Sequence, residues 1–136
     1  MADVKFEDYT IEVKNAMDDR INAVLEECAG ELESQVKRNT RVDTGKTKNS
    51  FRHRVDDESH TAHIGSDYEN AIWEEFGTGE HALEGNGRKG GWAYEDPRTG
   101  ETIWTHGKRP SRAFWNAYTS LKNKIIKHIQ EFMKGL

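Results

Sequence analysis

The sequence predicts an α+β fold in which an antiparallel β-sheet of about four strands is flanked by a long N-terminal helix, a short middle helix and a C-terminal helix. Three observations lead to this class. Apolar residues recur at three- and four-residue steps near both ends of the chain, and short segments between them alternate in polarity between turn residues. The length of 136 residues fits one domain, so we expect residues 1–136 to form a single unit.

The first helix is predicted from about Thr10 to Asn39. Its apolar stripe consists of Val13, Met17, Ile21, Val24, Leu25, Cys28, Leu32 and Val36. Gly30 weakens the middle of the helix by about 1 kcal/mol relative to Ala, yet the pattern continues past it. Roughly 30 residues form a rod about 45 Å long, which exceeds the diameter of a domain of this size. We therefore expect this helix to project or to pack on neighbouring molecules.

A break and two strands follow the first helix. Thr44-Gly45 marks the break, because glycine interrupts regular helices, and residues 46–50 suit a short helical turn. Even spacing of apolar residues predicts strands at residues 51–57 and 60–65, joined by an acidic turn. These two segments are the first half of the predicted sheet.

The middle helix is predicted from a capping-box match. Ser66-Asp67-Tyr68-Glu69 places a serine three residues before a glutamate, which indicates a helix start. Gly77 suits the left-handed conformation that ends a helix. The expected apolar face consists of Tyr68, Ile72, Trp73 and Phe76.

A glycine-rich segment, residues 77–91, is interpreted as a mobile loop. After it, residues 91–95 and 101–105 flank a turn at Asp96–Gly100, which predicts a hairpin. A symmetric register places Trp92 opposite Trp104, although the sequence does not fix that register.

The last helix is predicted to follow Ser111, its expected N-cap. Its stripe consists of Phe114, Ala117, Tyr118, Leu121, Ile125, Ile129 and Phe132, and Trp115, Ile126 and Met133 widen it.

Charge is segregated along the chain although the net charge is only −4. Residues 37–54 carry seven basic residues and one acid, residues 55–87 carry nine acids and no Lys or Arg, and residues 107–136 carry seven basic residues and one acid. Unlike blocks can meet across subunit contacts and set their register. Pairing within one chain and solvated surfaces are the alternatives, and the basic stretches could also contact nucleic acid.

Several classes of protein are disfavoured by composition. No run of eighteen apolar residues occurs, so we expect no membrane span, and the N-terminal residues lack the pattern of a signal peptide. Cys28 is the only cysteine, which excludes a disulfide framework and a cysteine-based zinc site. We expect a reducing cytosol, or a particle assembled there.

One tripeptide imitates an active site. Asp43-Thr44-Gly45 is the signature of aspartic proteases, in which two such loops share a proton between facing carboxylates. Here the preceding residues are polar and basic and Lys46 follows, whereas that chemistry requires a rigid turn after a buried apolar strand. The alternative is a loop in which Asp43 accepts hydrogen bonds from local backbone N–H groups.

The remaining motifs do not favour an enzyme. The glycine patterns in residues 77–90 lack the strand and the helix that a dinucleotide site requires, and the six histidines form no metal-ligand spacing. The sequence therefore predicts no catalytic residue, no cofactor and no metal.

Four segments together resemble a family of small tail components of long-tailed bacteriophages, the head–tail joining, neck or tail-completion proteins. They are the segment Val42–Phe51 with its Asp43-Thr44-Gly45, the segment Ile64–Gly79 that ends in Glu75-Phe76-Gly77-Thr78-Gly79, the segment Arg109–Phe114 that leads into the last helix, and the long N-terminal helix. The resemblance spans roughly residues 10–130. The Glu75–Gly79 string is its most specific part. Thr47 and Ser111-Arg112-Ala113 depart from the family pattern.

The resemblance implies a non-enzymatic ring subunit at the junction between the DNA-filled head and the tail, and such rings are often six-fold. The implied partners are further copies of the chain, head connector or portal-side proteins, and tail-tube or tail-terminator proteins, with DNA passing through the lumen without specific binding. The implied location is the virion, with assembly in the host cytoplasm. The residues it singles out as motif or interface candidates are Asp43, Thr44, Gly45, Tyr68, Trp73, Glu75, Phe76, Gly77, Gly79, Trp92, Trp104, Pro110 and Phe114.

Three other interpretations stay open at this point. The chain could be a tail terminator or minor tail protein of the same particle, a dimeric aspartic protease that uses Asp43, or a nucleic-acid-binding module that uses residues 37–54 and 108–127.

Overall fold

The computed structural model describes residues 10–42 and 45–135. It confirms the α+β class. The described elements are, in chain order, α1 (Thr10–Asn39), α2 (Lys46–Ser50), β1 (Phe51–Asp56), β2 (Thr61–Ser66), α3 (Glu69–Phe76), the 3₁₀ turn η1 (Gly79–His81), β3 (Trp92–Glu95), β4 (Thr102–Thr105) and α4 (Ala113–Lys134). Within these residues the four strands form two separate antiparallel pairs, β1–β2 and β3–β4, instead of one sheet.

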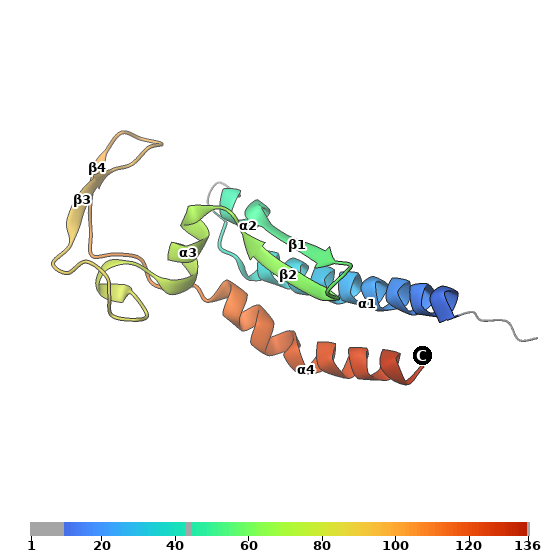
Figure 1. Cartoon of the computed structure of the whole chain (residues 1–136). Coiled ribbons are helices and arrows are strands. Elements are labelled where there is room, and N and C mark those ends of the chain that lie inside the picture. The colour runs from blue at the N-terminus through green and yellow to red at the C-terminus, as the bar shows by residue number, and fades with distance from the viewer. Residues whose placement is uncertain (1–9, 43–44, 136) are drawn as a thin grey trace, which may run out of the picture.

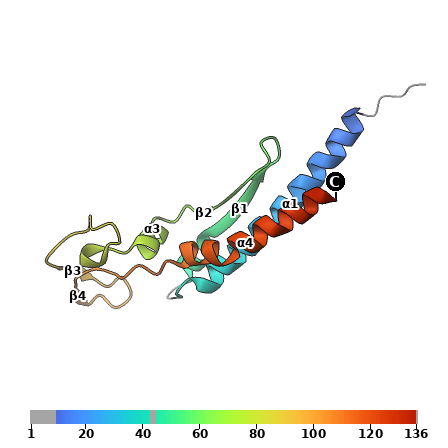
Figure 2. The same cartoon turned by 90° about the horizontal axis from the view of Figure 1, so that it is seen from below.

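The molecule is elongated, with a three-layered body and an arm at one end. In the body α1 lies between the β1–β2 hairpin on one side and α4 on the other (Figure 1). The arm, which consists of the glycine-rich segment and the β3–β4 hairpin, lies beyond the C-terminal end of α1 and the N-terminal end of α4 (Figures 1 and 2). The opposite end of the molecule carries the start of α1.

The core of the body lies around the C-terminal half of α1. Val36 and Ala117 are fully buried, and the cluster around them joins α1, β1, α3 and α4 through Leu32, Phe51 and Ala71. Phe51 and Phe114 meet with ring centroids 6.4 Å apart. Because so few large side chains are buried, the core is small for a chain of this length.

The first half of the α1 stripe does not reach this core. Val13 and Met17 are 55% and 40% exposed, whereas Val24, Cys28, Leu32 and Val36 are buried. The turn of the β1–β2 hairpin ends beside Asn22, where the His60 Nδ1 atom lies 2.9 Å from the Asn22 Oδ1 atom. The first turns of α1 therefore project beyond the sheet, as the length of the helix predicts.

The β1–β2 hairpin pairs Phe51 with Ser66 and Asp56 with Thr61. Alternate residues face α1, so Phe51, His53 and Val55 are covered while Arg52 and Arg54 are exposed. His53 lies over Gly30, at which an added Cβ would be 3.7 Å from the imidazole Cε1. The predicted strand alternation is confirmed.

The β3–β4 register differs from the symmetric one. Trp92 pairs with Thr105, and Ala93 pairs with Trp104, so the two tryptophans lie on opposite faces of the hairpin. The turn determines this shift: the Asp96 N–H donates to the Glu101 carbonyl at 2.8 Å and closes a loop around Pro97. The hairpin therefore does not adopt the symmetric register that would pair Trp92 with Trp104.

No helix in residues 10–42 or 45–135 combines the length and the apolar character that a membrane span requires.

Candidate functional site

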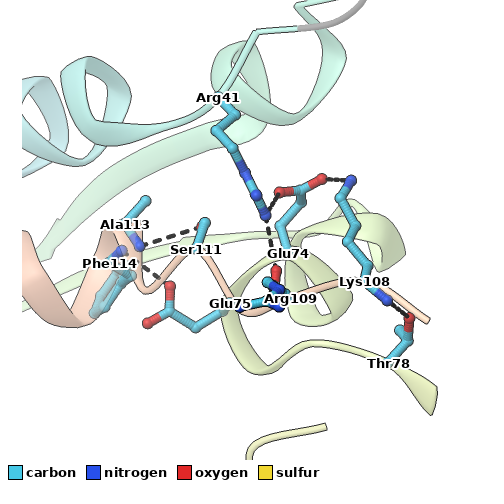
Figure 3. Close-up of polar contacts among 9 residues, drawn as sticks. All are labelled: Arg41, Glu74, Glu75, Thr78, Lys108, Arg109, Ser111, Ala113 and Phe114. Carbon is cyan, nitrogen blue, oxygen red and sulfur yellow. Dashed lines mark hydrogen bonds and ion pairs between the residues drawn. The ribbon is translucent and has the colours of Figure 1, made fainter. Parts of the chain in front are cut away.

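Three segments that are distant in the sequence converge where the body meets the arm. They are the end of α1, the segment from α3 to η1 that carries the Glu75–Gly79 string, and residues 106–115, which return from the arm into α4 (Figure 3). We call this convergence the junction. Glu74 and Glu75, the two adjacent glutamates at the end of α3, make the charged contacts that hold these segments together.

Glu74 is the charged centre of the junction and is only 9% exposed. The Arg41 Nη2 atom donates to its carboxylate at 3.1 Å, and the Lys108 ammonium binds the other carboxylate oxygen. The Glu74 backbone carbonyl also accepts a hydrogen bond of 2.7 Å from the Ser111 N–H. A buried carboxylate requires such partners, and these come from Arg41, two residues after the end of α1, and from the segment before α4.

This arrangement turns α3 the opposite way from the prediction. Ala71 and Glu74 face inward, whereas Ile72, Trp73 and Phe76 are 61%, 47% and 41% exposed. The expected apolar face is therefore outside. The two cations that bind Glu74 come from positions 33 and 34 residues away in the sequence, and a local pattern cannot reveal them.

Glu75 caps the N-terminus of α4. Its carboxylate oxygens accept hydrogen bonds from the Phe114 N–H at 3.0 Å and the Trp115 N–H at 2.9 Å. Its negative charge also lies at the positive end of the helix dipole and 3.7 Å from the Arg112 guanidinium. A side chain of α3 thus satisfies two N–H groups that have no partner within α4.

The two predicted serine caps are wrong. Ser111 Oγ reaches only the Ala113 N–H, at 3.4 Å, and the N-cap position of α4 is Arg112, in a left-handed conformation. At α3, Ser66 belongs to β2 and its hydroxyl accepts the Tyr68 N–H at 3.0 Å, so the helix starts at Glu69. Longer-range contacts, of Glu75 in particular, replace the local capping.

The two glycines of the Glu75–Gly79 string allow its backbone to pass close to the backbone of residues 106–110. Gly77 ends α3, as predicted, but its φ of 77° and ψ of 172° are an extended conformation with positive φ instead of the expected left-handed one. An added Cβ would meet the Lys108 carbonyl and Pro110 Cδ at 2.8 Å. Thr78 and Lys108 exchange two hydrogen bonds of 2.9 Å, one of them through the Thr78 hydroxyl. Gly79 has a φ of 61° and lies against the Trp92 ring. The first residues of the predicted loop therefore follow a hydrogen-bonded path along residues 106–108.

A groove lies on the arm side of α3. It has a volume of about 510 Å³, and Ile72, Trp73 and Phe76 form one wall. The glycine-rich segment forms the other wall with Ala82, Glu84, Asn86, Gly87 and Arg88, and Trp92 also lines it. We call it the aromatic groove. Pockets that bind small ligands have volumes of roughly 300–1,000 Å³, so this groove is large enough to receive side chains of another molecule.

A row of aromatic rings and cations continues from this groove along α4. The Arg112 guanidinium lies over the rings of both Phe76 and Trp115, at 5.3 and 5.5 Å from their centroids. Trp115 contacts Tyr118 at 5.8 Å, and the Lys122 ammonium lies 5.6 Å from the Tyr118 ring. Trp115 is 50% exposed, so this row remains available to a partner.

The titratable groups support structural roles. A hydrogen bond to Glu26 raises the pKa of His53. The Gly90 N–H lowers the pKa of the Glu80 carboxyl, which also lies 3.2 Å from His106 at the base of the arm. Burial raises the pKa of the Cys28 thiol, which keeps it protonated and unreactive. Among the described residues, no three His, Cys, Asp or Glu side chains are placed to share a metal ion.

The structure brings some of the predicted site residues together and separates others. Glu75, Phe76, Gly77 and Gly79 lie in the junction, where Pro110 contacts Gly77, and Phe114 extends from it into the core. The other described candidates lie outside it: Trp73 and Trp92 line the aromatic groove, Tyr68 precedes α3, Trp104 is 62% exposed on the hairpin, and Gly45 precedes α2 at a φ of 85°. Asp43 and Thr44 lie outside the described residues.

Sequence reasoning missed Glu74, Arg41 and Lys108. The available signal was the run of two acids in the acidic block together with basic residues on both flanking blocks.

Comparisons with known proteins place the chain in a family. The family model HK97-gp10-like, described as "Bacteriophage HK97-gp10, putative tail-component", matches residues 5–77, which is more than half of the chain. The match includes α1, both strands of the first hairpin and α3, and it ends at Gly77, where the arm begins. No curated protein and no solved structure matched. The chain belongs to the HK97-gp10-like family of bacteriophage tail components.

Proposed function

We propose that this virion-associated protein is a structural subunit that forms an oligomeric ring at the head–tail junction and joins the tail to the DNA-filled head. Its proposed partners are copies of itself, head connector or portal-side proteins, and tail-tube or tail-terminator proteins. DNA passes through the lumen of this ring without specific binding. Assembly takes place in the host cytoplasm, and the subunit makes or breaks no covalent bond.

The observation that carries this proposal is the exposure of large apolar side chains at opposite ends of the body. Ile72 and Trp73 are exposed beside the arm, and Val13 and Met17 are exposed on the first turns of α1. Surfaces of this kind mark contact sites with other proteins. Two different surfaces at opposite ends suit a heterologous contact, which closes into a ring when the rotation between subunits permits.

The arm provides a second contact surface. An isolated two-stranded hairpin is marginally stable in water, and β3–β4 contacts little beyond the junction. Trp104 and Tyr94 are 62% and 44% exposed on its two faces. Docking of these rings on a neighbouring head or tail protein would bury them and stabilise the hairpin.

Two features support a non-enzymatic role over the aspartic protease alternative. The Asp43-Thr44-Gly45 tripeptide falls between helices α1 and α2, whereas the protease mechanism requires it after a buried strand. The neighbouring Val42 is 64% exposed. We expect an Asp43→Asn variant to assemble as the wild type does.

Sedimentation velocity and negative-stain imaging of the purified protein test the ring. We expect an oligomer at low salt that dissociates as the salt concentration rises, because salt screens charge pairs between subunits. Ring-shaped particles would support the proposal. A strict monomer at high protein concentration and low salt would count against it.

A second candidate, contact with nucleic acid, rests on the outer face of β1–β2. Arg52, Arg54 and His63 are all exposed there, and Arg54 lies directly opposite His63. Salt-dependent retention on DNA at physiological ionic strength would favour this candidate. Absence of retention would remove it and leave the structural role unaffected.

A further inference from the structure

We propose that the aromatic groove of one subunit receives the projecting first turns of α1 from a second copy of the chain. This contact rests on the proposed ring and specifies its subunit interface. Helix α3, whose residues line the groove, lies toward the end of the molecule opposite to the start of α1, so one copy cannot fill its own groove (Figures 1 and 2).

The groove offers one exposed helical face. Ile72, Trp73 and Phe76 share the outer side of α3, because they lie at three- and four-residue steps or adjacent to them. Trp92 lines the same groove and is fixed from two sides: Arg88 lies 5.5 Å from its centroid, and it lies against Gly79. Aromatic side chains held in place in this way lose little freedom on binding, which favours a strong contact.

The projecting turns offer a matching pair of side chains. Val13 and Met17 are four residues apart and therefore lie on one face of α1. A helix that lays such a pair into an apolar groove is a common mode of recognition. The Met17 thioether makes favourable contacts with aromatic rings, and three of the groove residues are aromatic.

The charges beside the two surfaces are complementary. Glu69 lies on the same outer face of α3 as Ile72 and Phe76, and Glu84 lines the groove. Lys14 lies beside the Val13–Met17 face of α1. This pattern favours a second copy over an acidic partner protein.

Two single variants test the contact. Met17→Glu places an acid on the projecting face, and Ile72→Glu places an acid in the groove; both positions are exposed, so the fold of the subunit should be retained. Removal of a central interface anchor costs at least about 2 kcal/mol, so each variant should weaken self-association about 30-fold or more. Asn15→Glu, on the other side of the same turns, and Asn123→Glu, at an exposed position of α4, are the matched controls and should associate as the wild type does.

Mixing the two variants gives the sharper result. The intact groove of Met17→Glu can still receive the intact α1 of Ile72→Glu, but the other two surfaces each carry an added acid and repel each other. Sedimentation should show each variant alone as a monomer and the mixture as a species of two subunits that grows no further. A wild-type oligomer that either variant leaves intact would overturn the docking while the ring remains possible. A mixture without heterodimers, or a strictly monomeric wild type, would also overturn the docking.

Discussion

Replacement of Glu75 by Ala tests the junction most simply. The carboxylate is 15% exposed and accepts two hydrogen bonds from the first turn of α4, at 3.0 and 2.9 Å. Loss of a helix cap costs about 0.5–2 kcal/mol, and loss of the negative charge beside the helix dipole adds about 0.3–1 kcal/mol. We therefore expect the free energy of unfolding to fall by about 2 kcal/mol, which lowers the Tm by about 8 °C at roughly 4 °C per kcal/mol for a domain of this size.

Thermal and urea unfolding followed by circular dichroism measure this loss. Glu75→Gln keeps one oxygen acceptor but no charge, so its loss should be smaller than that of Glu75→Ala. Glu131→Ala is the control, because it removes an exposed glutamate from α4, far from the end that Glu75 caps, and should change stability by less than about 0.5 kcal/mol. Equal losses in Glu75→Ala and Glu131→Ala would refute the capping role.

Three further predictions concern the body and the string. Gly30→Ala should raise the free energy of unfolding by up to about 1 kcal/mol in urea titrations, because the new Cβ makes only an ordinary contact with His53; a loss of stability would contradict this. Gly77→Ala should lower the Tm more than Glu75→Ala does, because φ is positive and the Cβ would meet two groups at 2.8 Å; a neutral result would show that the junction can shift. The pKa of His53 is raised by Glu26, so its stabilising charge is fully present below the ordinary histidine value of about 6.5 and is lost as the pH rises through the raised pKa. The stability difference between wild type and His53→Gln should therefore shrink as the pH increases above about 6.5, and a difference that grows would contradict the Glu26 contact.

Elements with strong periodicity were predictable from the sequence. The stripe of α1 predicts both ends of the helix, Thr10 and Asn39, because every turn carries an apolar residue. The alternation in β1–β2 and the turn residues around Pro97 predict both hairpins. In each case the decisive contacts are local, so the sequence pattern contains them.

The junction was only partly predictable because long-range contacts decide it. The resemblance selects Glu75, but nothing local indicates that it caps a helix 39 residues away. The partners that draw Glu74 inward, Arg41 and Lys108, also reverse the orientation of α3. In the arm, the Asp96–Glu101 hydrogen bond moves the register by one residue, which a symmetric reading of the turn misses.

Electron microscopy of a phage that lacks this chain tests the central claim most directly. If the protein joins tails to heads, lysates of the deletion should contain DNA-filled heads and separate tails, and the wild-type gene supplied in trans should restore joined particles. Intact, infectious virions made without the protein would contradict the account.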